Sequence, residues 1–173
     1  VLEGSVIQLG AQDAYIKASG AFTGEISPQM LLDLGWTWTI IGHSERGHVL
    51  GELDELQNLK TTFALSSGLK VMFCIGELLE ERKANITNKV LERQLTLGLA
   101  GLSPENLENV VIAYEPVWAI GTGKVASPEQ AEDVHDFIRR LMVEIYGCMA
   151  EDVLILYGGS VTKDNIAELI AME

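Results

Sequence analysis

The stretch from Val110 to Ala126 reads VVIAYEPVWAIGTGKVA, and it decides how the rest of the chain is organised. Its first five residues, Val110–Tyr114, form an almost unbroken apolar run, which is typical of a strand buried on both faces of a parallel sheet. The run ends at a carboxylate, Glu115, and Pro116 then ends the strand because proline cannot donate to the ladder. This pattern predicts one acidic side chain at the carboxyl end of a buried strand.

An apolar loop with a glycine-rich shoulder follows this carboxylate. Its tip is Val117-Trp118-Ala119-Ile120, and its shoulder is Gly121-Thr122-Gly123, where backbone amides can face an anion. We expect the next helix to begin after Ser127, which Gln130 can join in a capping box. The layout suits a general base beneath a lid that excludes water. A lone Glu-Pro would favour a solvated loop acid beside ordinary turns, and it is the length of the whole stretch that favours the base.

The rest of the chain alternates strands with helices. Apolar runs predict five strands, at Val6–Ala11, Trp36–Ile41, Val71–Ile75, Val110–Tyr114 and Val153–Tyr157. Helical patterns that end at glycines predict five helical stretches, at Pro28–Leu34, Glu52–Ser66, Leu78–Ala100 with an interruption near Asn85, Pro128–Tyr146 and Lys163–Ala171. This alternation indicates an α/β protein with a parallel sheet.

Polar residues follow the carboxyl ends of all five predicted strands. They are Gln12, His43, Glu77, Glu115 and the run Gly158-Gly159-Ser160. Active sites of parallel α/β proteins lie at this end of the strands, and contributions from five strands favour a (β/α)8 barrel over a doubly wound sheet. A full barrel takes about 250 residues. We therefore expect residues 1–173 to form a single partial barrel domain with five of the eight β/α units.

Composition argues against several classes of protein. Twelve Lys and Arg residues stand against 25 Asp and Glu residues, for a formal net charge of −13, so a nucleic-acid surface is not expected. We expect no membrane partner and a cytoplasmic location, because no apolar stretch is long enough to span a bilayer and no secretory signal opens the chain. Cys74 lies in an apolar run and should be a buried free thiol. With Cys148 far away, neither a disulfide framework nor a metal site is expected.

Three motifs resemble those of the triosephosphate isomerase family, and together they are highly specific. They are EPVWAIGTGK at Glu115–Lys124, IGHSER at Ile41–Arg46 and YGGSV at Tyr157–Val161. A fourth stretch, GAFTGEIS at Gly20–Ser27, is similar to the family's dimer-forming loop and places Thr23 at its tip. The resemblance extends over nearly the whole chain, from near Val6 to near Leu169.

The resemblance implies a TIM barrel whose third to seventh strands are present, so we expect an internal fragment. It also implies an aldose–ketose isomerase, an intramolecular oxidoreductase of glycolysis and gluconeogenesis. Such an enzyme interconverts dihydroxyacetone phosphate and D-glyceraldehyde 3-phosphate by proton transfer through an enediolate. It needs no metal and no organic cofactor, and its partners are a small phosphorylated triose and a second copy of itself in a homodimer.

The resemblance assigns catalysis to Glu115 and His43. Glu115 would be the general base. His43 precedes a short helix beginning at Ser44, and the positive end of a helix dipole disfavours the imidazolium form. A neutral imidazole can donate a hydrogen bond to a substrate oxygen. A structural histidine is the alternative interpretation, and it is the one we give to His48 and His135.

The remaining roles concern the phosphate, the lid and supporting contacts. Substrate binding is expected from Gly121, Gly158, Gly159 and Ser160, whose amides can form an anion-binding nest. The lid comprises Pro116, Val117, Trp118, Ala119, Ile120, Thr122, Gly123, Lys124, Val125 and Ala126. In the family, hydroxyls matching Tyr157 and Ser160 hold the closed lid, here near Ala126 and Gly123. The acid matching Glu45 pairs with a catalytic lysine, and the arginine matching Arg46 pairs with the acid matching Glu25; ordinary surface ion pairs are the alternative.

One departure from the family bears on activity. The Asn-x-Lys of the first strand is missing, and none of the lysines of this chain follows such a strand. We therefore expect the chain alone to be inactive. A second interpretation is a non-catalytic phosphate-binding or assembly fragment that keeps the base and the lid but lacks the lysine.

Overall fold

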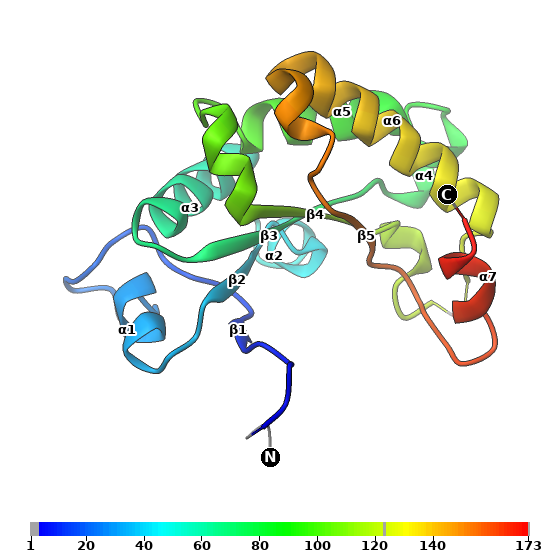
Figure 1. Ribbon diagram of the computed structural model, residues 1–173. Coiled ribbons are helices and arrows are strands. Elements are labelled where there is room, and N and C mark those ends of the chain that lie inside the picture. The colour runs from blue at the N-terminus through cyan, green and yellow to red at the C-terminus, as the bar shows by residue number, and fades with distance from the viewer. Residues whose placement is uncertain (1–3, 123, 173) are drawn as a thin grey trace.

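The computed structural model describes residues 4–122 and 124–172. The strands form one parallel sheet in the order β1-β2-β3-β4-β5, with β1 at Gly10–Ala11, β2 at Trp38–Ile41, β3 at Lys70–Ile75, β4 at Val110–Tyr114 and β5 at Ile155–Tyr157. Strands that pair in chain order, each with the next, are expected of consecutive units of a barrel, and the sheet curves accordingly (Figure 1). The predicted α/β class and the arc of a TIM barrel are confirmed.

The helices fall where the sequence predicts them. They are α1 at Pro28–Asp33, α2 at Ser44–His48, α3 at Asp54–Ser66, α4 at Leu79–Lys83, α5 at Thr87–Gly98, α6 at Pro128–Tyr146 and α7 at Ile166–Ile170. Short 3-10 turns lie at Pro104–Asn109 (η1), Val117–Ala119 (η2) and Gly147–Ala150 (η3). The predicted interruption near Asn85 separates α4 from α5, and Asn85 has a φ of 56°.

Local signals set the ends of α6. Ser127 Oγ accepts a hydrogen bond from the Gln130 amide at 3.2 Å, and the Gln130 side chain accepts from the Ser127 amide at 3.1 Å, which is the predicted capping box. Gly147 ends the helix with a φ of 73°, a conformation that costs glycine little. The helix therefore begins and ends where its own sequence specifies.

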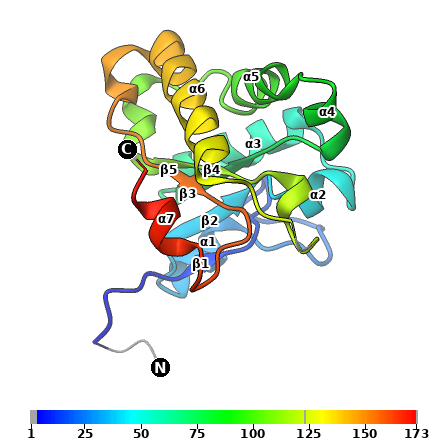
Figure 2. The ribbon, with the colours of Figure 1, turned by 90° about the vertical axis from the view of Figure 1, so that its right-hand side faces the viewer.

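The core lies between the sheet and the helices on its convex face. Helices α3, α5 and α6 cover that face (Figures 1 and 2). All five residues of β4 are buried, as its apolar run predicts. Ile41, Phe73, Leu91, Ile112 and Ile138 are fully inaccessible to solvent, and each such side chain stabilises the fold by about 1.5–3 kcal/mol.

The concave face of the sheet is open. An apolar hollow of about 540 Å³ lies on it, lined by residues that include Trp38, Met72, Val111 and Leu156. Val6 is 98% exposed and Leu154 is 63% exposed. The outer strands are shorter than predicted: β1 pairs with β2 at Gly10 and Ala11, and β5 pairs with β4 at Ile155–Tyr157. No helix in the described part of the chain is long and apolar enough to cross a membrane.

Candidate active site

Glu115 lies at the carboxyl end of β4 and is only 7% exposed. Its amide donates to the carbonyl of Ile75 at 2.7 Å, which extends the pairing of β3 and β4 by one step. Its Oε2 accepts from the amide of Ser44, the first residue of α2, at 3.3 Å. The backbone of the predicted base is thus fixed by the sheet, while its carboxylate is turned toward the start of α2.

His43 caps the start of α2 and faces this carboxylate. Its Nε2 lies 3.6 Å from Oε1 of Glu115, and its Nδ1 accepts a hydrogen bond from the amide of Glu45 at 3.3 Å. A ring nitrogen that accepts an N–H carries no proton, so this contact places the hydrogen of a neutral ring on Nε2. A distance of 3.6 Å is longer than a hydrogen bond, so His43 Nε2 and Glu115 Oε1 are not bonded to each other. Both atoms therefore face the same space and can bind a ligand there. The two side chains, which follow different predicted strands, thus meet at the carboxyl end of the sheet.

A thiol lies beneath the carboxylate. Cys74, on β3, is 3% exposed and is a free cysteine, as predicted, whereas Cys148 is exposed. Burial raises the pKa of the Cys74 thiol, and the neighbouring Glu115 carboxylate raises it further. The thiol therefore remains protonated beside Glu115 and can donate only a weak hydrogen bond to it.

Two glycines of the neighbouring strands pack against Glu115. A β-carbon on Gly76 would lie 1.7 Å from the Glu115 carbonyl oxygen, and one on Gly158 would lie 2.8 Å from Glu115 Cγ. The Gly158 amide donates to the carbonyl of Tyr114 at 2.7 Å. This amide is engaged in the sheet, in contrast to our expectation that it would face an anion; the close packing explains why glycine is needed there.

Gln94 is a contact that sequence reasoning missed. From α5, its side chain accepts from the Gly76 amide at 2.9 Å and donates to the Gly76 carbonyl at 3.1 Å. One side chain thus satisfies both backbone groups of the glycine that touches Glu115, much as a further strand would. One feature of the sequence could have indicated this contact: Gln94 is a polar residue three positions after Leu91, on the buried side of an amphipathic helix.

The first part of the lid is packed. Val117–Ala119 form the turn η2, Ala119 is fully buried, and Ser160 Oγ donates to the Ala119 carbonyl at 2.6 Å. Ser160 therefore contacts the lid, as expected, but at Ala119. The predicted contact near Gly123 lies outside the described residues. Pro116 is also buried, and the exposed residues among the described part of the lid are Gly121, Thr122, Lys124 and Val125.

The Tyr157 side chain faces the end of the lid. Its hydroxyl is buried without a hydrogen bond among the described residues. Burial raises the pKa of Tyr157, and the backbone of Ala126 partly opposes that rise. Gly159 must be a glycine beside this ring, because a β-carbon there would lie 2.3 Å from the Tyr157 hydroxyl oxygen. Gly121, whose φ is 65°, forms the exposed shoulder of the lid.

A buried carboxylate anchors the lid, and the sequence indicated only its place at a strand end. Glu77 follows β3 and is fully inaccessible. It accepts hydrogen bonds from the Tyr114 hydroxyl at 3.1 and 3.2 Å, from Trp118 Nε1 at 2.9 Å and from Arg82 Nη1 at 3.0 Å. Burial raises the pKa of Tyr114, and the Glu77 carboxylate raises it further, so the phenol stays a donor.

The predicted pairing of Arg46 with Glu25 is wrong. Arg46 Nη2 lies 3.1 Å from Asp13 and 2.5 Å from Glu52, and Lys60 Nζ lies 2.7 and 2.6 Å from the same two acids. Asp13 and Glu52 neutralise Arg46 within a partly buried cluster, whereas Glu25 is exposed on the projecting loop. Burial alone would raise the pKa of Glu52, but hydrogen bonds from Arg46 and Lys60 together lower it.

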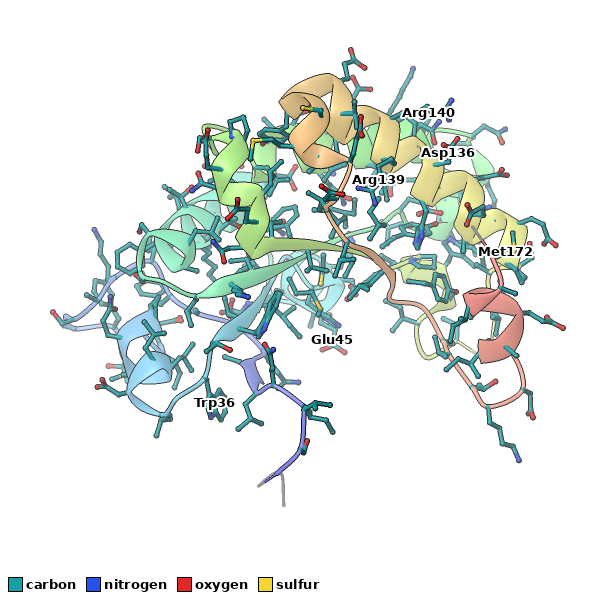
Figure 3. The ribbon with its side chains drawn as sticks, in the orientation of Figure 1. Trp36, Glu45, Asp136, Arg139, Arg140 and Met172 are labelled. Atoms are coloured by element: carbon teal, nitrogen blue, oxygen red, sulfur yellow. The ribbon has the colours of Figure 1, made fainter. Side chains whose placement is uncertain are left out.

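Glu45 and Thr23 are exposed. Glu45 forms no ion pair within the described residues; it lies on α2 and lines a hollow with His43, Asp13 and Arg46 (Figure 3). Thr23 is exposed on the loop between β1 and α1. Neither position brings its side chain to Glu115.

A buried carboxylate and a histidine that meet at the carboxyl ends of parallel strands are typical of the (β/α) barrel class. A family model described as triosephosphate isomerase matches residues 1–173. Relatives of that name include those of Carboxydothermus hydrogenoformans, 55% identical over 171 residues (98% of this chain, 68% of the relative), and Nitratidesulfovibrio vulgaris, 52% identical over 166 residues (95% and 66%). The chain belongs to the triosephosphate isomerase family, and it spans about two thirds of the length of these relatives.

Proposed function

We propose that this chain carries the proton-transferring part of a triosephosphate isomerase, which interconverts dihydroxyacetone phosphate and D-glyceraldehyde 3-phosphate. The observation that carries the proposal is the pairing of Glu115 with His43: a buried carboxylate 3.6 Å from Nε2 of an imidazole whose Nδ1 accepts a backbone N–H. A carboxylate and a hydrogen-bond donor then face one small space, as proton transfer next to a carbonyl requires.

The two side chains divide the protons between carbon and oxygen. Glu115 takes a proton from the hydroxyl-bearing carbon of dihydroxyacetone phosphate and later returns it to the neighbouring carbon. His43 donates its Nε2 proton to the carbonyl oxygen, and it regains a proton from the hydroxyl oxygen of the resulting enediol. The substrate loses no atoms and gains none, so no redox cofactor takes part in this sequence. The protonated Cys74 thiol adds no charge beside the base.

Phosphate binding is assigned to the lid and to the turn after β5. Gly121, Gly159 and Ser160 lie at the carboxyl ends of β4 and β5, where amides and a hydroxyl can receive an anion. Ser160 Oγ now donates to Ala119, so its contact with a phosphate would use its amide. The substrate would thus lie between these turns and Glu115, with its reacting carbons toward His43.

We further propose that the 173-residue chain is inactive by itself. It lacks the lysine that balances the substrate's charge in the family. Losing one preorganised group of this kind costs on the order of 100- to 1,000-fold in rate. The concave face, with Val6 and Leu154 exposed, also leaves the site open to water on one side. The homodimer expected from the resemblance and the cytoplasmic location expected from the composition stay predictions.

The alternative, a phosphate-binding or assembly fragment, is supported by the same open face. An apolar hollow between two edge strands favours association with a segment that closes the barrel. In that case Glu115 and His43 would be present, but the protein would not catalyse the isomerisation. The two proposals differ in what the chain does once the barrel is complete.

A chimera separates them. The remaining third of the barrel is taken from the Carboxydothermus hydrogenoformans relative, which is 55% identical to this chain, and joined to residues 1–173. We call this protein the completed barrel. We expect isomerase turnover from the completed barrel, none from its Glu115→Gln variant and none from the chain alone. A folded completed barrel without turnover would contradict the proposed function, and equal turnover by the chain alone would contradict its inactivity.

A further inference from the structure

Arg82, on α4, contacts the base of the lid at two points. Its Nη1 lies 3.0 Å from Oε1 of Glu77, and its guanidinium carbon lies 5.0 Å from the centre of the Trp118 ring. The Trp118 Nε1–H donates to the same Glu77 oxygen at 2.9 Å. Glu77 therefore holds the edge of the indole. Arg82 lies over the face of the indole and also binds Glu77.

The charge balance of this group also depends on Arg82. Glu77 is fully buried, and Tyr114 and Trp118 offer it only neutral donors. Among the described residues, Arg82 is the cation within ion-pair distance of Glu77. A buried carboxylate that loses its cation is strongly destabilised. Removing Arg82 would thus weaken the acceptor that holds the Trp118 indole, besides removing the stacked cation.

The position of Trp118 links this group to the lid. Trp118 lies in η2, three residues after Glu115, and its carbonyl accepts from Thr122 Oγ1 at 2.7 Å. Its neighbour Ala119 is fully buried and accepts from Ser160. A shift of the indole would therefore move both the turn that starts the lid and the contact that joins the lid to the loop after β5.

We propose that Arg82 is a positioning residue for the lid. It fixes Trp118 against the end of β3 and so sets the point from which the exposed part of the lid moves. Its side chain is 25% exposed, so it can be changed at the surface edge without opening the core. Its effect on turnover rests on the proposed function, whereas its hold on Trp118 does not.

The exchange of the Trp118 indole N–H with solvent, followed by NMR, measures this hold directly. The chain has three tryptophans, so a Trp118→Phe variant assigns the resonance. In Arg82→Met we expect exchange about tenfold faster, which corresponds to about 1.4 kcal/mol. Arg82→Lys should restore part of the protection, because lysine keeps the charge next to Glu77 but offers no planar face to stack.

Two controls show whether the effect is local. Lys83→Met removes a charge from the same helix at an exposed side chain and should leave Trp118 exchange unchanged. The Trp38 indole, which donates to Gln8, reports on the opposite end of the sheet within each variant. Unchanged Trp118 exchange in Arg82→Met would overturn the proposal, and so would equal acceleration of Trp38 and Trp118, because that would indicate global loosening.

Indole exchange is measured in both the chain and the completed barrel. If one of these proteins self-associates, the other still provides the test. In the completed barrel, Arg82→Met should also lower kcat about tenfold, with partial recovery in Arg82→Lys. An unchanged kcat would overturn the catalytic part of the inference. Absence of turnover in the unmodified completed barrel would instead count against the proposed function, while the indole exchange would still decide the role of Arg82.

Discussion

Gly76 lies directly against the backbone of Glu115: a β-carbon at this position would fall 1.7 Å from the Glu115 carbonyl oxygen. Both backbone polar groups of Gly76 are bound by the Gln94 side chain, so the glycine cannot move aside without breaking two hydrogen bonds. Gly158 also contacts the base, since a β-carbon there would lie 2.8 Å from Glu115 Cγ. The base is therefore placed by the absence of side chains on its neighbours as much as by its own contacts.

Gly76→Ala should displace Glu115. The added methyl meets backbone, which yields less easily than a flexible side chain, so we expect a loss of about 1–3 kcal/mol in unfolding free energy and a fall in kcat of the completed barrel. Denaturant unfolding and steady-state kinetics measure the two effects. Gly47→Ala is the matched control, since its nearest neighbours would be 3.8 and 3.9 Å away and alanine suits a helix. Equal behaviour of the two variants would rule out a positioning role for Gly76.

Glu115→Asp should separate chemistry from binding. The shorter side chain withdraws the carboxylate from the carbon it deprotonates, and a displacement of about 1 Å can cost on the order of 100-fold in rate. We therefore expect kcat of the completed barrel to fall about 100-fold while KM changes little. Glu129→Asp, at an exposed glutamate near the start of α6, should change neither value. A raised KM with an unchanged kcat would instead indicate that Glu115 only binds the substrate.

Cys74 should resist thiol reagents in the folded protein. Burial and the Glu115 carboxylate raise its pKa above the ordinary value of 9.0, so the reactive thiolate does not form at moderately alkaline pH. A disulfide reagent should therefore titrate one thiol, the exposed Cys148, at pH 8 to 9, and a second thiol only after denaturation. The Cys148→Ser variant should show no reaction before unfolding. Rapid labelling of Cys74 in that variant would mean that the floor of the site is open.

His135 should make stability depend on pH. Burial lowers its pKa below the ordinary value of 6.5, and Arg139 lowers it further. Between 6.5 and the lowered value, the unfolded chain binds a proton that the folded chain does not. Unfolding free energy should therefore fall as the pH is lowered from 6.5, by at most about 1.4 kcal/mol per pH unit, and level off below the folded pKa.

Denaturant unfolding of His135→Gln and His48→Gln tests this dependence in the completed barrel. His135 packs edge-on against Tyr114 with 6.1 Å between ring centres, and its Nε2 is buried without a hydrogen bond among the described residues. His48 is exposed. Only the His135 variant should lose the pH-dependent part of stability between pH 5 and 6.5. Retention of the full dependence in that variant would assign it to other groups.

The sequence was sufficient for the features that local interactions determine. The apolar run Val110–Tyr114 predicted a strand buried on both faces, and the strand occupies those residues. Ser127 and Gly147 predicted the ends of α6 for reasons contained within one helical turn. Polar residues at strand ends predicted that His43 and Glu115 would meet, because parallel strands present their carboxyl ends at one edge of a sheet.

Contacts between distant residues were decided only by the tertiary structure. The sequence suggested Glu25 as the partner of Arg46, but Asp13 and Glu52 lie closer and are held by Lys60. Such choices depend on distances of a few ångströms between separate elements, which spacing along the chain does not encode. The lengths of β1 and β5 were decided in the same way, since a strand extends only where a neighbouring strand completes its hydrogen bonds.

The same reason explains which residues of the site went unrecognised. Gln94 and Arg82 lie on helices, outside the strand-end pattern that marked the polar residues. Their roles arise when the packing of α4 and α5 on the sheet brings one against Gly76 and the other over Trp118. The sequence alone thus determined the kind of fold and which polar residues follow the strand ends, because periodicity and strand ends are local, while the roles of Glu115 and His43 came from the family resemblance and stay predictions. The tertiary structure decided how these two groups are held, because that depends on which side chains the packed helices bring against them.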